Sequence, residues 1–91
     1  MIAAERIAAC REKGREAIWY AAIMPDGGGV KGRTDALDRL IAFERAEAAY
    51  TTHLTHVSAP HYLLALPCLL GDCDRLTELA AAMQEIEEAQ P

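Results

Sequence analysis

The sequence predicts an all-α protein, a small bundle of three or four helices that forms a single domain over residues 1–91. Its eighteen alanines favour helix, and apolar side chains recur at alternating spacings of three and four residues in three stretches. Helix-start signals at Thr34 and at Ser58-Ala59-Pro60 separate these stretches. Only twenty-six residues are large and apolar, so the core is thin, and a thin core is commonly supplemented by self-association or a partner.

The first helix is expected over residues 2–24. Its stripe of mostly small side chains, which lets a neighbouring helix approach closely, comprises Ala3, Ile7, Cys10, Gly14, Ala17, Ala21 and Met24. From Ile18 to Met24 every residue is apolar. This end is therefore either covered on all sides or exposes a patch around Trp19, Tyr20 and Ile23. Trp19 can be the core plug of the bundle or an intermolecular contact, and a short buried strand is a further alternative for this run.

A glycine-rich loop is expected over residues 25–33 and a second helix over residues 35–57. Thr34 is placed to cap this helix, and Asp35 in the first turn suits the positive end of the helix dipole. The apolar stripe comprises Ala36, Leu40, Phe43, Glu47, Tyr50, Leu54 and Val57, widened by Leu37 and Ile41. Glu47 is surrounded by alanines, which are small enough to let its carboxylate reach water or an arginine.

The corner at Ser58-Ala59-Pro60 is expected to fold a third helix, residues 59–89, back on the second as a helical hairpin. The apolar stripe of this helix comprises Tyr62, Leu66, Leu69, Cys73, Leu76, Ala80 and Met83. Pro67 and Gly71 interrupt it, so the helix is either kinked or broken near residues 67–72. Acidic residues within 85–88 oppose the helix dipole at the C-terminal end, which is therefore expected to fray.

Charge is distributed unevenly along a chain whose net charge is −5. Residues 1–33 contain six basic and four acidic residues, a net charge of +2, whereas residues 34–91 contain three and ten, a net charge of −7. Such an acidic chain is a poor candidate for direct nucleic-acid binding and suits a basic surface on another protein, although acidity can also serve solubility alone.

The chain has three cysteines, which cannot all pair internally, and it shows no secretory leader and no long apolar run. These features predict a protein of the reducing cytoplasm that does not enter a membrane.

No motif predicts catalysis or a cofactor. Residues 27–34, GGGVKGRT, are one residue short of a phosphate-binding loop, have Arg33 in place of its lysine, and follow a predicted helix instead of a strand. The candidate metal ligands near the corner are His53, His56, His61 and Cys73, but they lack the tight Cys/His pairs of structural zinc sites. The cysteines lie on or beside apolar stripes, as core cysteines do. We therefore expect neither an enzyme nor a bound cofactor.

The segment 50–79 has a recognisable pattern. An alanine-rich helix end is followed by Ser58-Ala59-Pro60, by the run Leu63-Leu64-Ala65-Leu66, and by leucines at helical spacing at positions 69, 70, 76 and 79. In this pattern the chain resembles the C-terminal segment of the ead-type accessory early proteins of lambdoid phages and prophages. The resemblance implies a phage or mobile-element accessory protein of the bacterial cytoplasm and implies no catalytic residues. In size and acidity the chain is also similar to many anti-CRISPR proteins.

These observations lead to the hypothesis of a phage-type accessory protein that acts without catalysis by binding a host protein, with an inhibitor of a bacterial defence complex as its leading class. The partner is expected to present a basic surface, and the candidate contact residues are Trp19, Tyr20, Ile23, Asp35, Asp38, Glu44, Asp72 and Asp74. The alternative is a self-associating helical module, a homodimer paired through Ala3, Ile7, Gly14, Ala17 and Ala21. A metal-binding domain is the third hypothesis.

Overall fold

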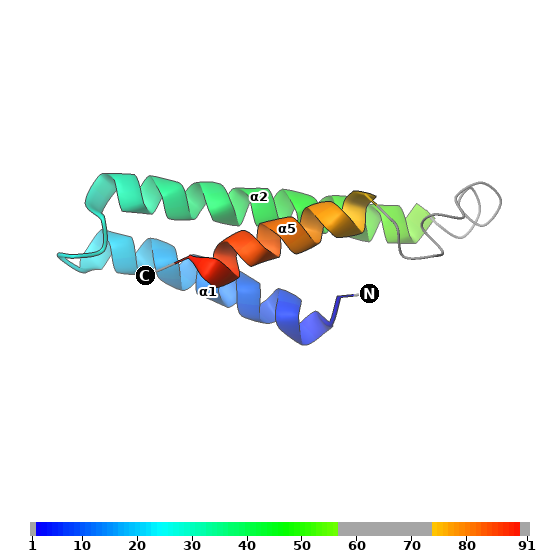
Figure 1. The fold of residues 1–91 in the computed structure, drawn as a ribbon, viewed down its shortest axis with the longest axis horizontal. Coiled ribbons are helices and arrows are strands. Elements are labelled where there is room, and N and C mark those ends of the chain that lie inside the picture. The colour runs from blue at the N-terminus through cyan, green and yellow to red at the C-terminus, as the bar shows by residue number, and fades with distance from the viewer. Residues whose placement is uncertain (1, 57–73, 90–91) are drawn as a thin grey trace.

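A computed structural model describes residues 2–56 and 74–89 of the chain. Within these residues it contains three helices and no strand: α1 (Ala4–Ile23), α2 (Gly29–His56) and α5 (Asp74–Glu88) (Figure 1). The predicted small all-α bundle is therefore confirmed. The predicted corner at Ser58-Ala59-Pro60 and the kink near residues 67–72 lie outside the described residues.

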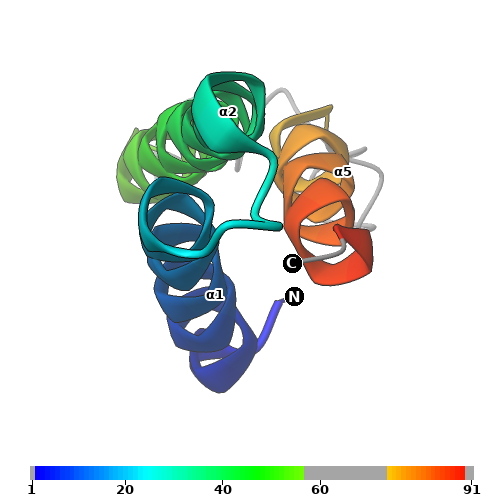
Figure 2. The same cartoon turned by 90° about the vertical axis from the view of Figure 1, so that its left-hand side faces the viewer.

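The three helices pack around a common axis. α1 and α2 form an antiparallel hairpin, and α5 lies along both of them (Figure 1). Viewed from the end, the helices occupy the corners of a triangle (Figure 2). α2 has 28 residues and α1 has 20, whereas α5 has 15. At about 1.5 Å per residue, α5 is too short to cover the whole length of the α1–α2 hairpin.

The core lies where all three helices meet. Phe43, Leu79 and Met83 are completely buried. The full cluster of buried residues is Cys10, Leu40, Phe43, Tyr50, Leu79, Met83 and Ile86. The stripes predicted for the first two helices supply its α1 and α2 members, because helical periodicity alone decides which side of each helix is apolar.

Gly14 of α1 lies close to side chains of both α2 and α5. A Cβ atom there would lie 2.9 Å from Leu40 Cδ1 and 3.5 Å from Ile86 Cδ1. The expected close packing against the small-residue stripe of α1 is confirmed, and its partners are α2 and α5. Cys10, Gly14 and Ala21 are buried within the bundle. The homodimer predicted through this stripe stays a prediction.

The phase predicted for the last helix needs correction. The predicted stripe continued through Leu76, Ala80 and Met83, whereas the structure buries Leu79, Met83 and Ile86. The prediction transferred the phase of residues 62–73 across Pro67 and Gly71, but the α5 helix begins at Asp74 and takes its rotation from its contacts with α1 and α2. Leu76 still packs against the edge of the core.

The second helix begins at Gly29, inside the stretch predicted to be a loop. The tight connection uses left-handed backbone at two glycines, Gly28 (φ 93°) and Gly29 (φ 61°). Gly32 is already helical, and a Cβ atom there would lie 2.5 Å from the carbonyl oxygen of Gly27. Composition predicted a loop up to Arg33 because it cannot separate glycines that turn the chain from glycines that permit close contact.

Thr34 consequently does not cap the helix. It lies within α2, and its hydroxyl donates a hydrogen bond to the Val30 carbonyl oxygen at 2.9 Å. Lys31 pairs with Asp35 one turn later at 2.7 Å. The segment that resembled a phosphate loop thus comprises the end of the connection, at Gly27 and Gly28, and the beginning of α2, residues 29–34.

The acidic end of α5 is held by basic side chains of α1. Arg6 forms two hydrogen bonds with the Glu87 carboxylate, at 2.9 and 2.7 Å, and Lys13 Nζ donates to the Glu87 carbonyl oxygen at 2.6 Å. The hydrogen bond from Arg6 lowers the pKa of the Glu87 carboxyl below its ordinary value. A cation that satisfies a terminal carbonyl stabilises a helix C-terminus. The predicted fraying is therefore wrong as far as Glu88, the last residue of α5.

A second interhelical ion pair joins α1 to α2, in addition to the pair between α1 and α5. Arg11 contacts the Glu47 carboxylate and also lies over the Phe43 ring, with 5.6 Å between its guanidinium carbon and the ring centroid. The expectation that Glu47 reaches an arginine is confirmed. Both interhelical ion pairs join the basic N-terminal third to acids later in the chain, so part of the charge asymmetry is used within the molecule.

Candidate functional site: the outer face of α1

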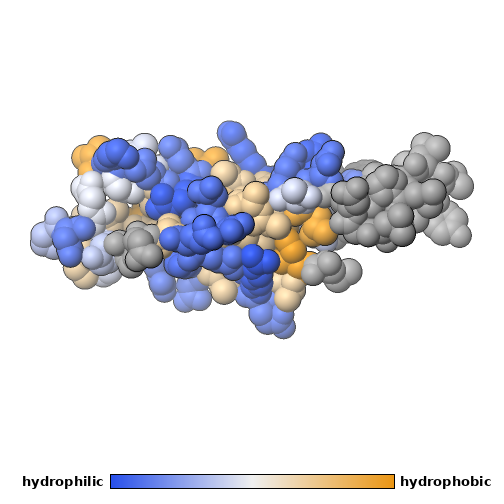
Figure 3. Space-filling view, viewed as in Figure 1, coloured by the Kyte–Doolittle hydropathy of each residue, from blue (hydrophilic) through white to orange (hydrophobic). Residues whose placement is uncertain are grey.

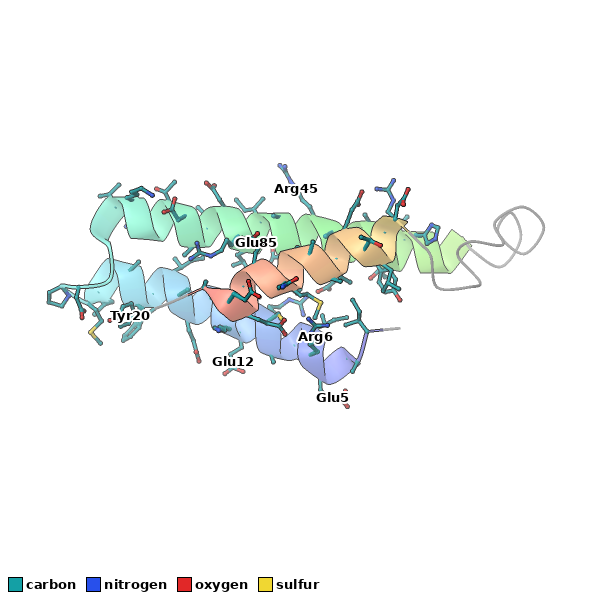
Figure 4. The ribbon with its side chains drawn as sticks, viewed as in Figure 1. Glu5, Arg6, Glu12, Tyr20, Arg45 and Glu85 are labelled. Atoms are coloured by element: carbon teal, nitrogen blue, oxygen red, sulfur yellow. The ribbon has the colours of Figure 1, made fainter. Side chains whose placement is uncertain are left out.

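The side of α1 that faces away from the core carries a continuous exposed stripe. Its members are Glu5, Glu12, Glu16, Trp19 and Ile23, which we call the α1 outer face. Their spacings of seven, four, three and four residues return to the same side of a helix. In Figure 4, Glu5 and Glu12 point away from α2 and α5.

The apolar half of the α1 outer face consists of Trp19 and Ile23, one helical turn apart. Trp19 is 58% exposed and Ile23 is 59% exposed. Trp19 is therefore a surface residue and does not fill the centre of the core, which Phe43 of α2 occupies. The intermolecular contact through Trp19 stays a prediction. The strand alternative is wrong, since helix α1 continues to Ile23.

The acidic half consists of the three glutamates. Glu5, Glu12 and Glu16 are exposed, and none of them forms a hydrogen bond or an ion pair with another described residue. One cation, Arg15, lies at the edge of this face. The free carboxylates attract cations, and the exposed tryptophan on the same face can bury apolar area against a partner.

Tyr20, the third predicted contact residue of α1, has a different environment. It is half-buried, and its hydroxyl donates a hydrogen bond to the Asp26 carboxylate at 3.1 Å. This hydrogen bond raises the pKa of the Tyr20 hydroxyl above its ordinary value. Tyr20 therefore links the end of α1 to the connection before α2.

A groove opens beside the α1 outer face, where α5 ends. Its volume is about 460 Å³, and it is lined by Lys13, Gly14, Glu16, Ala17, Trp19, Tyr20, Ala36, Arg39, Ile86 and Ala89. Four of the lining residues are glycine or alanine, and Glu16 and Trp19 belong to both the groove and the outer face. Arg39 is half-buried at the groove and forms no ion pair with the other described residues. This groove can receive one apolar side chain of a partner.

The face of the molecule on which α5 lies is largely polar (Figure 3). In the view of Figure 3, hydrophilic residues cover most of the middle of the bundle and apolar residues form only small patches between them. Within the described residues, no helix is long and apolar enough to cross a membrane.

The acidic residues predicted to contact a partner are not gathered around Trp19. Asp35 pairs with Lys31, Asp38 and Glu44 are exposed along α2, and Asp74 is the first residue of α5. Asp72 lies outside the described residues. The carboxylates beside Trp19 are instead Glu12 and Glu16, which the sequence pattern indicates only as part of the charged side of α1. The spacings of Glu12 and Glu16 from Trp19 and Ile23 place all four residues on one side of a helix. This pattern is the sequence signal that could have identified the two glutamates.

The metal hypothesis finds no support in the described part of the chain, where no three His, Cys, Asp or Glu side chains are grouped to hold a metal ion. His53 is half-buried on α2. His61, Cys73 and the side chain of His56 lie outside the described residues, so the predicted ligand set is not described as a whole. Cys10 is 2% exposed, and burial raises the pKa of its thiol, which is typical of a core cysteine and not of a nucleophile.

Comparison of the chain with protein-family models, with curated proteins and with solved structures gave no match. The α1 outer face and the adjoining groove are therefore the candidate site on structural grounds alone.

Proposed function

We propose that this protein acts without catalysis, by binding a partner protein through the α1 outer face. The observation that carries the proposal is the exposure of Trp19 and Ile23, 58% and 59%, side by side on one helix. Tryptophan is the residue type most enriched among interface hot spots. Single exposed apolar residues are ordinary on protein surfaces, but here the only tryptophan of the chain has an apolar neighbour one turn away.

The chemistry of this face specifies the partner. Glu12 and Glu16 lie on the same stripe as Trp19 and are free of intramolecular ion pairs with described residues. The complementary surface has an apolar pocket for Trp19 and lysines or arginines around it. It also offers one apolar side chain to the groove between Glu16 and Ile86. The carboxylates then mainly accelerate and orient the encounter, while the buried apolar contacts supply affinity.

Within this function, we propose a phage or mobile-element accessory protein that works in the bacterial cytoplasm and inhibits a host defence complex. The support is the resemblance of residues 50–79 to the ead-type accessory early proteins and the similarity in size and acidity to anti-CRISPR proteins. Defence complexes that handle nucleic acid present strongly basic surfaces. An acidic face with an exposed tryptophan is suited to occupy such a surface.

The first experiment is affinity capture from bacterial lysate with matched variants. The wild-type chain and Arg45→Ala, which truncates an exposed side chain of α2 that belongs to neither surface, should recover the same partner. Trp19→Ala should weaken the recovered interaction by about 30-fold or more, the effect of losing a hot-spot residue. Equal capture by Trp19→Ala and Arg45→Ala, or no partner with the wild-type chain, would contradict the proposed function.

The acidic component is tested with charge-reversal variants against the partner recovered. Glu12→Lys and Glu16→Lys should lower the association rate and weaken its dependence on salt, whereas Glu85→Lys on α5 serves as the matched control. Glu85 lies on α5, away from the α1 outer face (Figure 4). An association rate that is equal in all three variants would rule out a basic partner surface.

The defence hypothesis has its own readout. Expression of the wild-type chain in a host with an active defence complex should increase phage plating efficiency, and Trp19→Ala should abolish the increase. If the chain binds a partner through Trp19 and plating does not change, the binding function stands and the defence role is wrong.

A further inference from the structure

The outer side of α2 has a second row of uncovered apolar side chains. Val30, Leu37 and Ile41 are 74%, 44% and 39% exposed, so neither α1 nor α5 covers them. Their spacings of seven and four residues place them on one side of the helix. A row of this kind along a helix is typical of a helix–helix contact.

Two charges of opposite sign flank the row. Arg33 precedes Leu37 by one turn, and Glu44 follows Ile41 by about one turn. Both side chains are exposed, and neither forms an ion pair or a hydrogen bond with another described residue. Ala48, also exposed, extends the row at the C-terminal side as Val30 does at the N-terminal side. We call these six residues the α2 stripe: Val30, Arg33, Leu37, Ile41, Glu44 and Ala48.

The α2 stripe is complementary to itself in the antiparallel direction. If a twofold axis passes beside residue 39, Leu37 lies opposite Ile41 of the second copy. Arg33 is then about 9 Å before the axis and Glu44 about 7.5 Å after it, so the two charges meet within reach of an ion pair. Val30 and Ala48 lie at equal distances from the axis and face each other.

We propose that the protein forms a homodimer in which two α2 helices pack antiparallel through the α2 stripe. This arrangement buries four apolar side chains from each copy and places an ion pair between Arg33 and Glu44 at both ends. A parallel arrangement would instead place Arg33 opposite Arg33 and Glu44 opposite Glu44, which costs like-charge repulsion. The charges therefore select the antiparallel direction. The interface lies on a different helix from the α1 outer face, so one dimer presents two partner-binding faces.

The oligomeric state of the full chain is the first test, measured by analytical ultracentrifugation across the micromolar range in reducing buffer. The wild-type chain should sediment as a dimer. Leu37→Glu, which places a charge at the centre of the interface, should raise the dimer dissociation constant by about 30-fold or more. Ile23→Glu is the matched control, since it introduces the same charge at an exposed apolar position of α1, and it should leave the dimer intact. A monomeric wild-type chain, or equal effects of the two variants, would overturn the proposal.

Charge exchange tests the register. Arg33→Glu and Glu44→Arg alone should each weaken the dimer by about tenfold, because each places like charges together at both ends. The double variant should restore the wild-type dissociation constant, and Glu85→Arg should have no effect. Circular dichroism verifies that each variant is folded. Failure of the double variant to restore the dimer, when the single variants weaken it, would overturn the antiparallel pairing.

Discussion

The middle of the bundle and the end at which α1 connects to α2 are built from the same two helices. Of these two regions, α5 covers only the middle. In the middle, Gly14 lies against Leu40 and Ile86, and Phe43 is completely buried. At the other end, Trp19 and Ile23 remain more than half exposed, whereas Ala21 between them is buried. The difference teaches that a residue of α1 becomes core or binding surface according to the side of the helix on which it lies, because Trp19 and Ile23 are on the side that faces away from α2 and α5.

The largest effect should come from a core truncation in the middle. Phe43→Ala should lower the free energy of unfolding by about 3–5 kcal/mol, because it removes a buried ring and leaves a cavity. Trp19→Ala, which truncates a larger side chain at the exposed end, should cost only about 0.5 kcal/mol. Urea unfolding followed by far-ultraviolet circular dichroism measures both.

Equal losses in the free energy of unfolding for Phe43→Ala and Trp19→Ala would contradict the contrast between the covered middle and the exposed end. Should Phe43→Ala not fold, Phe43→Leu keeps most of the apolar volume and should still lose more stability than Trp19→Ala.

A smaller effect on stability is expected from alanine substitutions at Gly32 and Gly14, two glycines that permit close contacts. At Gly32, in the α1–α2 connection, a Cβ atom would lie 2.5 Å from a backbone oxygen, whereas at Gly14 the nearest atom is the end of the Leu40 side chain at 2.9 Å. Gly32→Ala should therefore destabilise the protein by about 1–3 kcal/mol. Gly14→Ala should change the stability by no more than about 1 kcal/mol, because Leu40 can shift and alanine favours helix.

Thermal and urea unfolding of the two alanine variants decide this point. A greater loss for Gly14→Ala would show that the middle of the bundle is packed more rigidly than the connection.

The smallest effect concerns the ion pair that fastens the end of α5 to α1. Arg6→Gln should return the pKa of the Glu87 carboxyl towards its ordinary value, about 4.3 for glutamate, and should reduce stability slightly at neutral pH. A carboxyl whose pKa is lowered by folding stabilises the protein above its unfolded pKa, and that contribution disappears as the pH falls through the folded pKa. The wild-type chain should therefore lose more stability than Arg6→Gln on acidification below about pH 4.3.

Carboxyl-carbon NMR titration measures the pKa of Glu87 directly. Arg45→Gln is the control, because Arg45 points away from the bundle and has no ion pair with the described residues (Figure 4). If Arg6→Gln and Arg45→Gln leave the same pKa at Glu87, then Arg6 does not hold the end of α5.

Much of the fold follows from local patterns. The spacing of apolar residues along α1 and α2 is sufficient to identify Cys10, Leu40, Phe43 and Tyr50 as core residues. The start of α2 could not be predicted in the same way, because composition alone does not show that Gly28 and Gly29 turn the chain whereas Gly32 is helical and packs against Gly27. The rotation of α5 likewise depends on the two helices beneath it.

The candidate site was predicted in part. The run of apolar residues from Ile18 to Met24 indicated Trp19 and Ile23 as possible contacts, but it could not decide whether they were covered. The two glutamates beside them were not identified, since a charged helix side is expected on every surface helix. Glu12 and Glu16 become candidate contact residues because Trp19, on the same stripe, is exposed.

By itself, the sequence determined that the protein is helical and which sides of α1 and α2 are apolar, because both properties depend on spacings of three and four residues along the chain. Only the tertiary structure decided that Arg6 meets Glu87, 81 positions later, and that neither α2 nor α5 covers Trp19. Contacts between residues so far apart depend on how the helices are arranged in space, and periodicity carries no information about that arrangement.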